Sequence, residues 1–414
     1  MTQLYWGAHP EYDAAIAAGV RQGLSWQDIA DHLTLTYKVR FTDQSVRGRT
    51  RRPSFGVVLE HPPEPDPVVR FEAKAHVERD RVADRQLVRE IAKSQAERDL
   101  AQATLDLYEQ AHKHPIIIPD WQQDIRASQG QHHAIVMAQL TDWHLDEVVE
   151  PDEVEYLNAY NADIAMIRMK RWVEKVATLP REYVKGITID GLVIPATGDL
   201  FTGEIHAELK ESNERRILES LLFWQAPVMA ALRTLEREYP AVAVHAVVGN
   251  HGRLAQKSVF KGRVYDNVEW LFWSTIRDRL ADLGSTITVN VATSMDLNVP
   301  VYGRNYLLTH GDQFKGGTGI SGAFAPLSLG SHRKGKRQSM AGLPMETMVI
   351  GHLHQLINIP GVIMGGTMKG IDEFAFGINV PPAEASQALW ITTPERAQTI
   401  WMPVYLQSRT DEGW

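Results

Sequence analysis

The chain has 414 residues, so two or three domains are expected, and its 44% hydrophobic and 23% charged content is that of a soluble globular protein. It contains no cysteine, which excludes disulfides, thiolate-zinc sites and cysteine nucleophiles and leaves histidine, carboxylate, amide and carbonyl groups as metal ligands. The formal net charge of −8 argues against a chain that is basic all over, as a nonspecific nucleic-acid coat would be.

The N-terminal residues MTQLYWGAHPEYD lack the basic and apolar segments of a secretory signal. No apolar run approaches the roughly 18 residues needed to span a bilayer. A cytoplasmic protein with no membrane partner is therefore expected. Apolar spacing then predicts three short helices, at 11–23, 24–33 and 41–52. Ser25 is the expected N-cap of the second helix, and Thr42 or Asp43 that of the third.

The third predicted helix is strongly basic, since residues 38–52 hold six Lys or Arg against one Asp. Two short helices followed by a basic one resemble a helix-turn-helix module, which places a DNA-binding domain at 1–58. Gln44 and Ser45 near the start of this helix would reach base edges. The arginines that would meet phosphates are Arg47, Arg49, Arg51 and Arg52. A plain structural or oligomerisation bundle is the alternative.

The segment LEHPPEPDPVV, residues 59–69, has four prolines in eleven residues and predicts a stiff linker over 59–76. Residues 77–114 contain neither glycine nor proline and carry dense charge of both signs, which predicts one long helix. This helix would be either a dimerisation arm, giving a homo-oligomer, or a helix packed against the next domain.

From residue 131 short apolar runs alternate with helical stretches such as 154–178 and 211–238, which predicts an α/β layered domain over 131–414. The C-terminal part, 380–414, either completes a sheet or covers the domain. Five apolar runs end on polar residues able to bind a metal. They are HAIVMAQL, GLVIPATG, AVAVHAVVG, NYLLTHG and ETMVIGHLH. Because ligands gather where strand ends open onto loops, one common site is expected there.

The polar groups at these five ends follow the order D-x-H, G-D, G-N-H, H-G and G-H-x-H. They lie at Asp142-Trp143-His144, Gly198-Asp199, Gly249-Asn250-His251, His310-Gly311-Asp312 and Gly351-His352-Leu353-His354. Over about 131–380 this series resembles that of the calcineurin-like metallophosphoesterases. The resemblance implies two packed mixed sheets flanked by helices, with a two-metal centre at the strand ends.

The resemblance also implies which side chains hold the metals. They are Asp142, His144 and His354 for one metal, Asn250, His310 and His352 for the other, and Asp199 as the bridge between them. Imidazole and carboxylate donors suit Mn²⁺, the first expectation, and also Fe or Zn²⁺. A hydroxide shared by two metals would be the nucleophile. His251 would protonate the leaving alkoxide as the catalytic acid, or would only hydrogen-bond to the ligands.

Family members commonly carry Asp or Glu after G-N-H, whereas this chain has Gly252 and then Arg253. A carboxylate there would be expected to orient His251, so its absence puts the placement of the acid in doubt. Arg253 is predicted to contact a nonbridging phosphate oxygen, as a second catalytic residue.

The segment after His310 combines glycines and two phenylalanines, Phe314 and Phe324, and residues 315–337 hold five Lys or Arg and no acid. This composition predicts a mobile basic loop that binds a nucleic-acid strand. The predicted contacts are Lys315, Arg333, Lys334, Lys336 and Arg337. An insertion without substrate contact is the alternative. The run G-D-L-F at Asp199 resembles that of the double-strand-break repair nucleases of the family.

Together these patterns predict a two-metal phosphodiesterase that acts as a DNA endo- or exonuclease. A phosphatase or a small-nucleotide phosphodiesterase, with the basic loop as a lid, is the rival in chemistry. A non-catalytic DNA-binding scaffold on a degenerate fold is the rival from another class.

Overall fold

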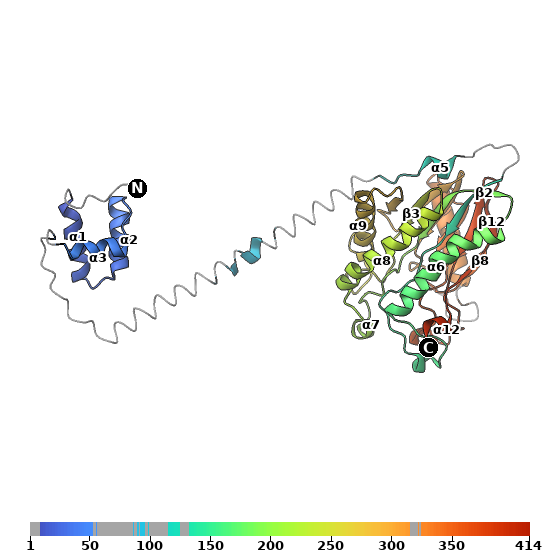
Figure 1. Ribbon diagram of the computed structural model, residues 1–414. Helices are drawn as coiled ribbons and strands as arrows, with labels where there is room; N and C mark the ends of the chain where they lie inside the picture. The colour runs from blue at the N-terminus through green and yellow to red at the C-terminus, as the bar shows by residue number, and fades with distance from the viewer. Residues whose placement is uncertain are drawn as a thin grey trace. The chain divides into compact units, whose positions relative to one another are not determined.

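The computed structural model describes residues 9–52, 55, 86, 89–90, 92–95, 98, 115–124, 132–314, 322 and 324–414 (Figure 1). The chain divides into two compact units, residues 1–110 and 111–414. The predicted linker at 59–76 lies outside the described residues. So does most of the predicted helix at 77–114, although its eight described positions are helical. Within the described ranges, every helix is too short or too polar to cross a membrane.

The first unit contains three short helices, as predicted: α1 (Pro10–Arg21), α2 (Trp26–Tyr37) and α3 (Asp43–Thr50). Ser25 caps α2 by accepting from the backbone N–H of Asp28, and Thr42 caps α3 by accepting from that of Ser45. The small core between the helices consists of Tyr12, Ile16, Ile29, Ala30, Leu33, Phe41 and Val46.

One of the predicted phosphate contacts in this unit is wrong. Arg49 is 5% exposed, and its Nε donates to Oδ1 of Asp13 on α1 over 2.7 Å. Its charge is therefore neutralised inside the bundle, where it joins α3 to α1. Arg47, Arg51 and Arg52 are exposed, and their contact with DNA stays a prediction.

The second unit contains two large sheets. The six-stranded sheet has the order β12-β11-β1-β2-β3-β4, with β12 (Arg396–Trp401), β11 (Leu389–Thr393), β1 (His132–Ala138), β2 (Ile187–Ala196), β3 (Val242–Ala246) and β4 (Thr288–Val291). Strands β1 to β4 run parallel, in a register that pairs Val193 with both Met137 and Ala243, and β11 and β12 are antiparallel. The C-terminal segment thus completes this sheet.

The five-stranded sheet has the order β5-β6-β7-β9-β8, with β5 (Asp296–Val301), β6 (Arg304–Thr309), β7 (Thr347–Ile350), β9 (Val362–Met364) and β8 (Ile357–Ile359). Its strands β6, β7 and β9 are parallel. A short pair, β10 (Ser386–Gln387) with β13 (Val404–Tyr405), forms a separate two-stranded sheet.

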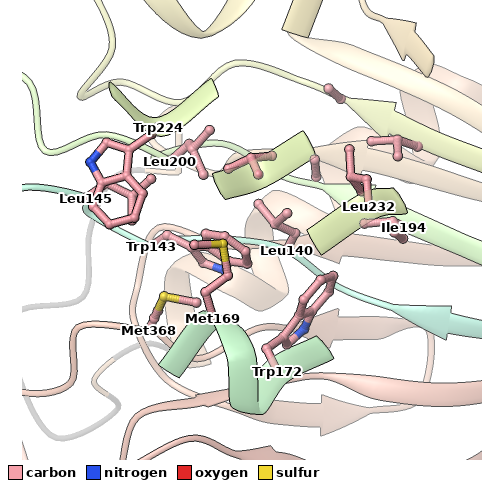
Figure 2. Packing of buried hydrophobic residues seen from close by; sticks show 14 of the residues in the cluster. Leu140, Trp143, Leu145, Met169, Trp172, Ile194, Leu200, Trp224, Leu232 and Met368 are labelled. Atoms are coloured by element: carbon pink, nitrogen blue, oxygen red, sulfur yellow. The ribbon is translucent and has the colours of Figure 1, made fainter. Parts of the chain in front are cut away.

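The two sheets pack face to face. Along β1, Ile135 and Met137 lie in a core shared with residues of β5, β6, β7 and β9, whereas Val136 and Ala138 lie in the core beneath the helices. Those helices are α6 (Ala162–Tyr183), α8 (Ile217–Glu238) and α9 (Val268–Asp282), and Figure 1 shows α6 beside α8. Their core is rich in tryptophan, with Trp143, Trp172 and Trp224 fully buried (Figure 2).

Helix α10 (Phe324–Met340) covers the outer face of the second sheet, where Leu327 packs in one cluster with Met348 and Ile350. The domain is therefore an α/β fold with two packed sheets flanked by helices, as predicted. The prediction of a loop over 324–337 is wrong. The face that α10 buries includes Gly330, Lys334 and Gln338, so it carries little apolar periodicity in the sequence.

Two predicted helices have other bounds than expected. Residues Pro151–Val154 form only a short 3₁₀ turn, and α6 begins at Ala162 because Asn161 caps it, accepting from the N–H of Ile164 over 2.9 Å. The helix predicted from 211 is divided into α7 (Ala207–Ser212) and α8.

A buried histidine joins the segment before β1 to the first sheet. His245 on β3 donates from Nε2 to Gln122 of α5 (Asp120–Gln123) over 3.0 Å and accepts at Nδ1 from Asn290 of β4 over 3.1 Å. Both ring nitrogens are thus used by the neutral form. Burial lowers the pKa of His245 to about 3.

This histidine is expected to make the fold acid-sensitive. In the unfolded chain it binds a proton near pH 6.5, and in the folded chain only near 3, so its stabilisation is present above pH 6.5 and is lost as pH falls toward 3. In chelator-treated protein the free energy of unfolding should fall more steeply between pH 6 and 4 in wild type than in His245→Gln, by up to about 1.4 kcal/mol per pH unit. Denaturant titrations at a series of pH values measure both slopes, and equal slopes would contradict the assignment.

Candidate metal centre

The five predicted strands end in loops that meet at one place. Strands β1, β2 and β3 are parallel neighbours in the first sheet, and β6 and β7 are parallel neighbours in the second, so their carboxyl ends open toward common edges. The loops after these strands supply Asp142, His144, Asp199, Asn250, His251, His310, His352 and His354.

Ligand atoms of these side chains form three overlapping groups, in each of which all atoms lie within 4.8 Å of one another. The groups are Asp142, His144 and His354; His144, Asp199 and His251; and Asp199, His310 and His352. The Oδ1 of Asn250 joins the last group, 3.0 Å from Nε2 of His310. All seven predicted metal-binding residues therefore come together, and the carboxylate of Asp199 belongs to two of the three groups.

The hydrogen bonds of His310 show that this cluster suits a cation. Its Nδ1 donates to the backbone carbonyl of Thr197 over 2.8 Å, which leaves the lone pair of Nε2 directed at the site. That nitrogen lies 2.9 Å from Oδ2 of Asp199 and 3.0 Å from Oδ1 of Asn250, two acceptor oxygens. Although burial opposes protonation, the charge of Asp199 raises the pKa of His310 to about 10. Without a metal, Nε2 of His310 is therefore protonated, and a bound cation would take the place of that proton between the ring and the two oxygens.

A second facing pair supports the same conclusion. The Nε2 atoms of His144 and His354 lie 3.0 Å apart, and His354 Nε2 is 3.5 Å from Oδ1 of Asp142. Burial and the positive charge of Lys369 lower the pKa of His144 to about 4, which keeps its ring neutral and able to bind a metal. Imidazole, carboxylate and amide donors without thiolate suit Mn²⁺, Fe or Zn²⁺.

The backbone around the cluster adopts a conformation that L-residues rarely occupy. Five of the predicted ligands have positive φ: Asp142 (50°), His144 (48°), Asp199 (53°), His352 (72°) and His354 (55°). Each such residue costs on the order of 1–3 kcal/mol, and residues of this kind cluster at functional sites. The cost is offset by bonds between the loops, such as the N–H of His352 donating to Asp142 and that of His251 to Asp199.

Close packing of two loops requires glycine before Asn250. A Cβ at Gly249 would lie 2.0 Å from Oδ1 of Asp199 and 2.3 Å from its backbone nitrogen. Any side chain there would push apart the loops that carry Asp199 and Asn250.

His251, the predicted catalytic acid, is held without a carboxylate. Its Nδ1 donates to the backbone carbonyl of Thr202 over 2.7 Å, so Nε2 is the free nitrogen, and this ring packs edge-on against His144 at 4.7 Å. The carbonyl thus provides the orientation that an acidic residue at position 252 would be expected to provide. Burial lowers the pKa of His251.

Arg253, the second predicted catalytic residue, holds its own loop. Its Nε, Nη1 and Nη2 donate to the backbone carbonyls of Ala255, Asn250 and Gln256, over 3.0, 3.0 and 2.9 Å. These three bonds give Arg253 a structural role, and its contact with a phosphate oxygen stays a prediction.

The basic residues predicted on the second unit have different surroundings. Lys334 is 6% exposed, and its Nζ lies 2.5 Å from Oδ1 of Asp296, so its prediction as a nucleic-acid contact is wrong. Arg337 pairs with the same carboxylate but is exposed. Arg333 and Lys336 are exposed on α10, and Lys315 lies outside the described residues.

Three buried charged residues behind the cluster were not predicted. Lys369 donates to Glu147 over 2.6 Å, and Glu147 lies 3.4 Å from Nδ1 of His144. Glu269 of α9 accepts backbone N–H groups of two ligand loops. Only the acidic run around Glu147 was a signal in the sequence, since Lys369 and Glu269 belong to segments without a recognisable motif.

No family model and no curated protein matches the chain. Its structure is similar to a dimetal phosphatase from Danio rerio, at a TM-score of 0.30 and 10% identity over 66% of this chain and 99% of that one. It is also similar to Vps29 complexed with Zn²⁺ from Entamoeba histolytica, at 0.26 and 12% over 66% and 99%. A conserved uncharacterized protein of Streptococcus pneumoniae TIGR4, a predicted phosphoesterase, gives 0.24 and 10% over 65% and 97%. Because these TM-scores and identities are low, the function is inferred below from the geometry of the site and not from these similarities.

Proposed function

We propose that this chain is a two-metal-dependent phosphodiesterase and that its substrate is DNA. One observation carries the proposal: Asp199 lies in two of three overlapping groups of ligand atoms, supplied by five strand ends. Two cations held a few ångströms apart need such a shared anion. A centre of this kind is suited to displacement at a phosphorus atom, because both the attacking and the leaving oxygen are stabilised.

In the proposed reaction two bound divalent ions, Mn²⁺ as the first expectation, would supply a hydroxide nucleophile and neutralise the phosphate oxygens. Asp142, His144 and His354 would hold one ion, and Asn250, His310 and His352 would hold the other. Thr197 fixes the tautomer of His310 through its carbonyl. His251 is fixed in the same way by Thr202, which aims Nε2 into the site, and in its imidazolium form it would give the Nε2 proton to the leaving oxygen and keep the Nδ1 proton on the Thr202 carbonyl.

The choice of DNA is supported by exposed cations on each unit. Arg47 on α3 and Arg51 and Arg52 just after it are exposed, as are Arg333 and Lys336 on α10. A polymer of phosphates gains affinity from each such charge it meets, whereas a small phosphate ester meets few of them.

The direct test is cleavage of linear double-stranded, single-stranded and circular DNA beside a small aryl phosphodiester, each with Mn²⁺ and with chelator. We expect cleavage of DNA and of the aryl diester that depends on Mn²⁺, and the circular substrate separates endonuclease from exonuclease action. Hydrolysis of the aryl diester with all DNA untouched would establish a small-molecule phosphodiesterase instead. If the protein bound two metals but hydrolysed neither DNA nor the aryl diester, the alternative of a non-catalytic DNA-binding scaffold would be favoured.

The helical bundle is expected to contribute to the binding of DNA and not to the hydrolysis of a small diester. Deletion of residues 1–60, or the triple substitution Arg47→Gln, Arg51→Gln and Arg52→Gln in the intact chain, should raise the KM for DNA by about tenfold or more at moderate salt. The aryl diester should be hydrolysed at the wild-type rate, because it lacks the run of phosphates through which DNA would gain affinity from those arginines. Unchanged DNA kinetics in both variants would remove the bundle from substrate binding.

A further inference from the structure

A single buried carboxylate connects two of the ligand loops. Glu269 is fully buried in the first turn of α9. Its Oε1 accepts from the backbone N–H of Leu200 over 2.7 Å, and its Oε2 accepts from that of Gly249 over 2.9 Å. Leu200 directly follows Asp199, and Gly249 directly precedes Asn250. Each oxygen of the carboxylate therefore holds one loop of the metal centre.

The start of α9 holds Glu269 rigidly in this position. Asn267 caps the helix, with Oδ1 accepting from the N–H of Glu269 over 2.9 Å, and its Nδ2 donates to the carbonyl of Gly249 over 2.8 Å. The N–H of Val268 donates to the carbonyl of Gly252 over 2.8 Å. Three consecutive residues thus bind the loop that carries Asn250 and His251.

The same packing explains the glycine after His251. A Cβ at Gly252 would lie 2.4 Å from Oδ1 of Asn267 and 3.0 Å from Cγ of Glu269. An acidic side chain at position 252 would have to occupy the volume that Asn267 and Glu269 fill. In this chain the carboxylate that supports the backbone of this loop therefore comes from a helix rather than from the loop itself.

We propose that Glu269 is a positioning residue for the metal centre: by holding Leu200 and Gly249 it sets the separation of Asp199 and Asn250, and so determines whether the second metal binds beside the first. This inference rests on the proposed two-metal site. A carboxylate suits the role because both of its oxygens are acceptors, and two N–H donors from different loops face it.

The geometry assigns the effect to one metal more than to the other. The site expected at Asn250, His310 and His352 takes its amide ligand from a loop that Glu269 holds. The group of Asp142, His144 and His354 has no member in common with the group of Asp199, His310 and His352, and only the expected bridge Asp199 would connect the two sites. Loss of the clamp should therefore weaken the former site and leave the latter nearly intact.

The test is Glu269→Gln in the full chain with Mn²⁺ as the probe. An amide has one acceptor oxygen, so its NH₂ group would face an N–H of Leu200 or Gly249 and push one loop away. Titration calorimetry should show one Mn²⁺ site weakened 10–100-fold, the usual effect of losing a residue that supports a ligand, and the other changed by less than about threefold. The paramagnetic resonance spectrum should change from that of a coupled Mn²⁺ pair to that of a single ion.

Glu236→Gln is the matched control. Glu236 of α8 also accepts a backbone N–H, that of Thr286 over 2.6 Å, and the hydroxyl of Ser285, in a loop that supplies none of the predicted ligands. It should keep two Mn²⁺ ions of wild-type affinity. If both variants lost metal equally, the effect would be general destabilisation and the proposal would be overturned.

Glu269→Asp provides a second measurement should the glutamine variant fold poorly. It keeps the charge but is one methylene shorter, so it can hold only one loop, and we again expect selective loss of one Mn²⁺ ion. Two ions bound at wild-type affinity in whichever of these variants folds would overturn the proposal. Wild-type protein that binds two ions but cleaves no phosphodiester would refute the proposed function alone. Fewer than two ions in wild type would refute both.

Discussion

Asp199→Asn should abolish metal-dependent hydrolysis, because it removes the carboxylate shared by two groups of ligand atoms. The Oδ1 of Asp199 already accepts from the N–H of His251 over 2.8 Å, and its Oδ2 lies 2.9 Å from His310. An asparagine keeps one acceptor and turns an NH₂ group toward the other partner. It also loses the negative charge that holds two divalent cations close together. Both metal affinities should fall by more than the 10–100-fold typical of supporting residues.

Metal analysis after dialysis against limiting Mn²⁺, with the aryl diester assayed in parallel, measures this effect. Asp190→Asn is a suitable control, because Asp190 is also a buried carboxylate of β2 but pairs with His133 over 2.8 Å, away from the ligand loops. The control should retain two metals. Retention of both metals by Asp199→Asn would show that the motifs have been assigned to the wrong ligands.

His251→Ala should lower turnover by about 10²–10⁴-fold while both metals stay bound. The seven predicted ligands remain in this variant, and what is lost is the ring whose Nδ1 donates to Thr202 and whose Nε2, protonated in the imidazolium form, would supply the proton. The loss should depend on the leaving group. It should be large for DNA, whose leaving alkoxide needs a proton, and small for an aryl diester, whose phenolate leaves without one.

This dependence separates an acid from a supporting residue, since a residue that only orients the ligands would slow both substrates alike. His206→Gln is the matched control, because its exposed imidazole lies 6.1 Å from the ring of His251 without belonging to any of the three groups of ligand atoms. Loss of metal in His251→Ala would identify His251 as a ligand instead. The geometry permits that outcome, since the ring of His251 belongs to one group of possible ligand atoms with His144 and Asp199.

The strands that carry the site could be predicted because buried parallel strands are continuous apolar runs and end abruptly at polar residues. HAIVMAQL, for instance, became β1 (His132–Ala138) with Asp142 just beyond it. Helix α10 could not be predicted in the same way, since the face it buries contains Lys334 and Gln338. Its polarity becomes intelligible only once Asp296 of another strand lies beside Lys334.

The residues that support the ligand loops, such as Glu269, could not be predicted from the sequence pattern for a related reason. Glu269 is separated by 69 residues from Leu200 and by 20 from Gly249, the two groups it binds. Nothing in the local sequence marks a glutamate in an apolar helix as an acceptor for distant backbone groups. Arg49 was misjudged likewise, because its partner Asp13 lies on another helix. Charge alone does not distinguish a surface cation from a buried one.

The ligands come from both sheets of the sandwich, which couples the metals to folding itself. Asp142, Asp199 and Asn250 follow strands of one sheet, whereas His310 and His352 follow strands of the other. Ions that bind only when these edges meet add RT ln(1 + [metal]/Kd) to the folded state, about 2.7 kcal/mol for one site at a hundredfold excess over Kd. In a chain without cysteine, the metal pair would thus serve as the cross-link between the two halves of the domain.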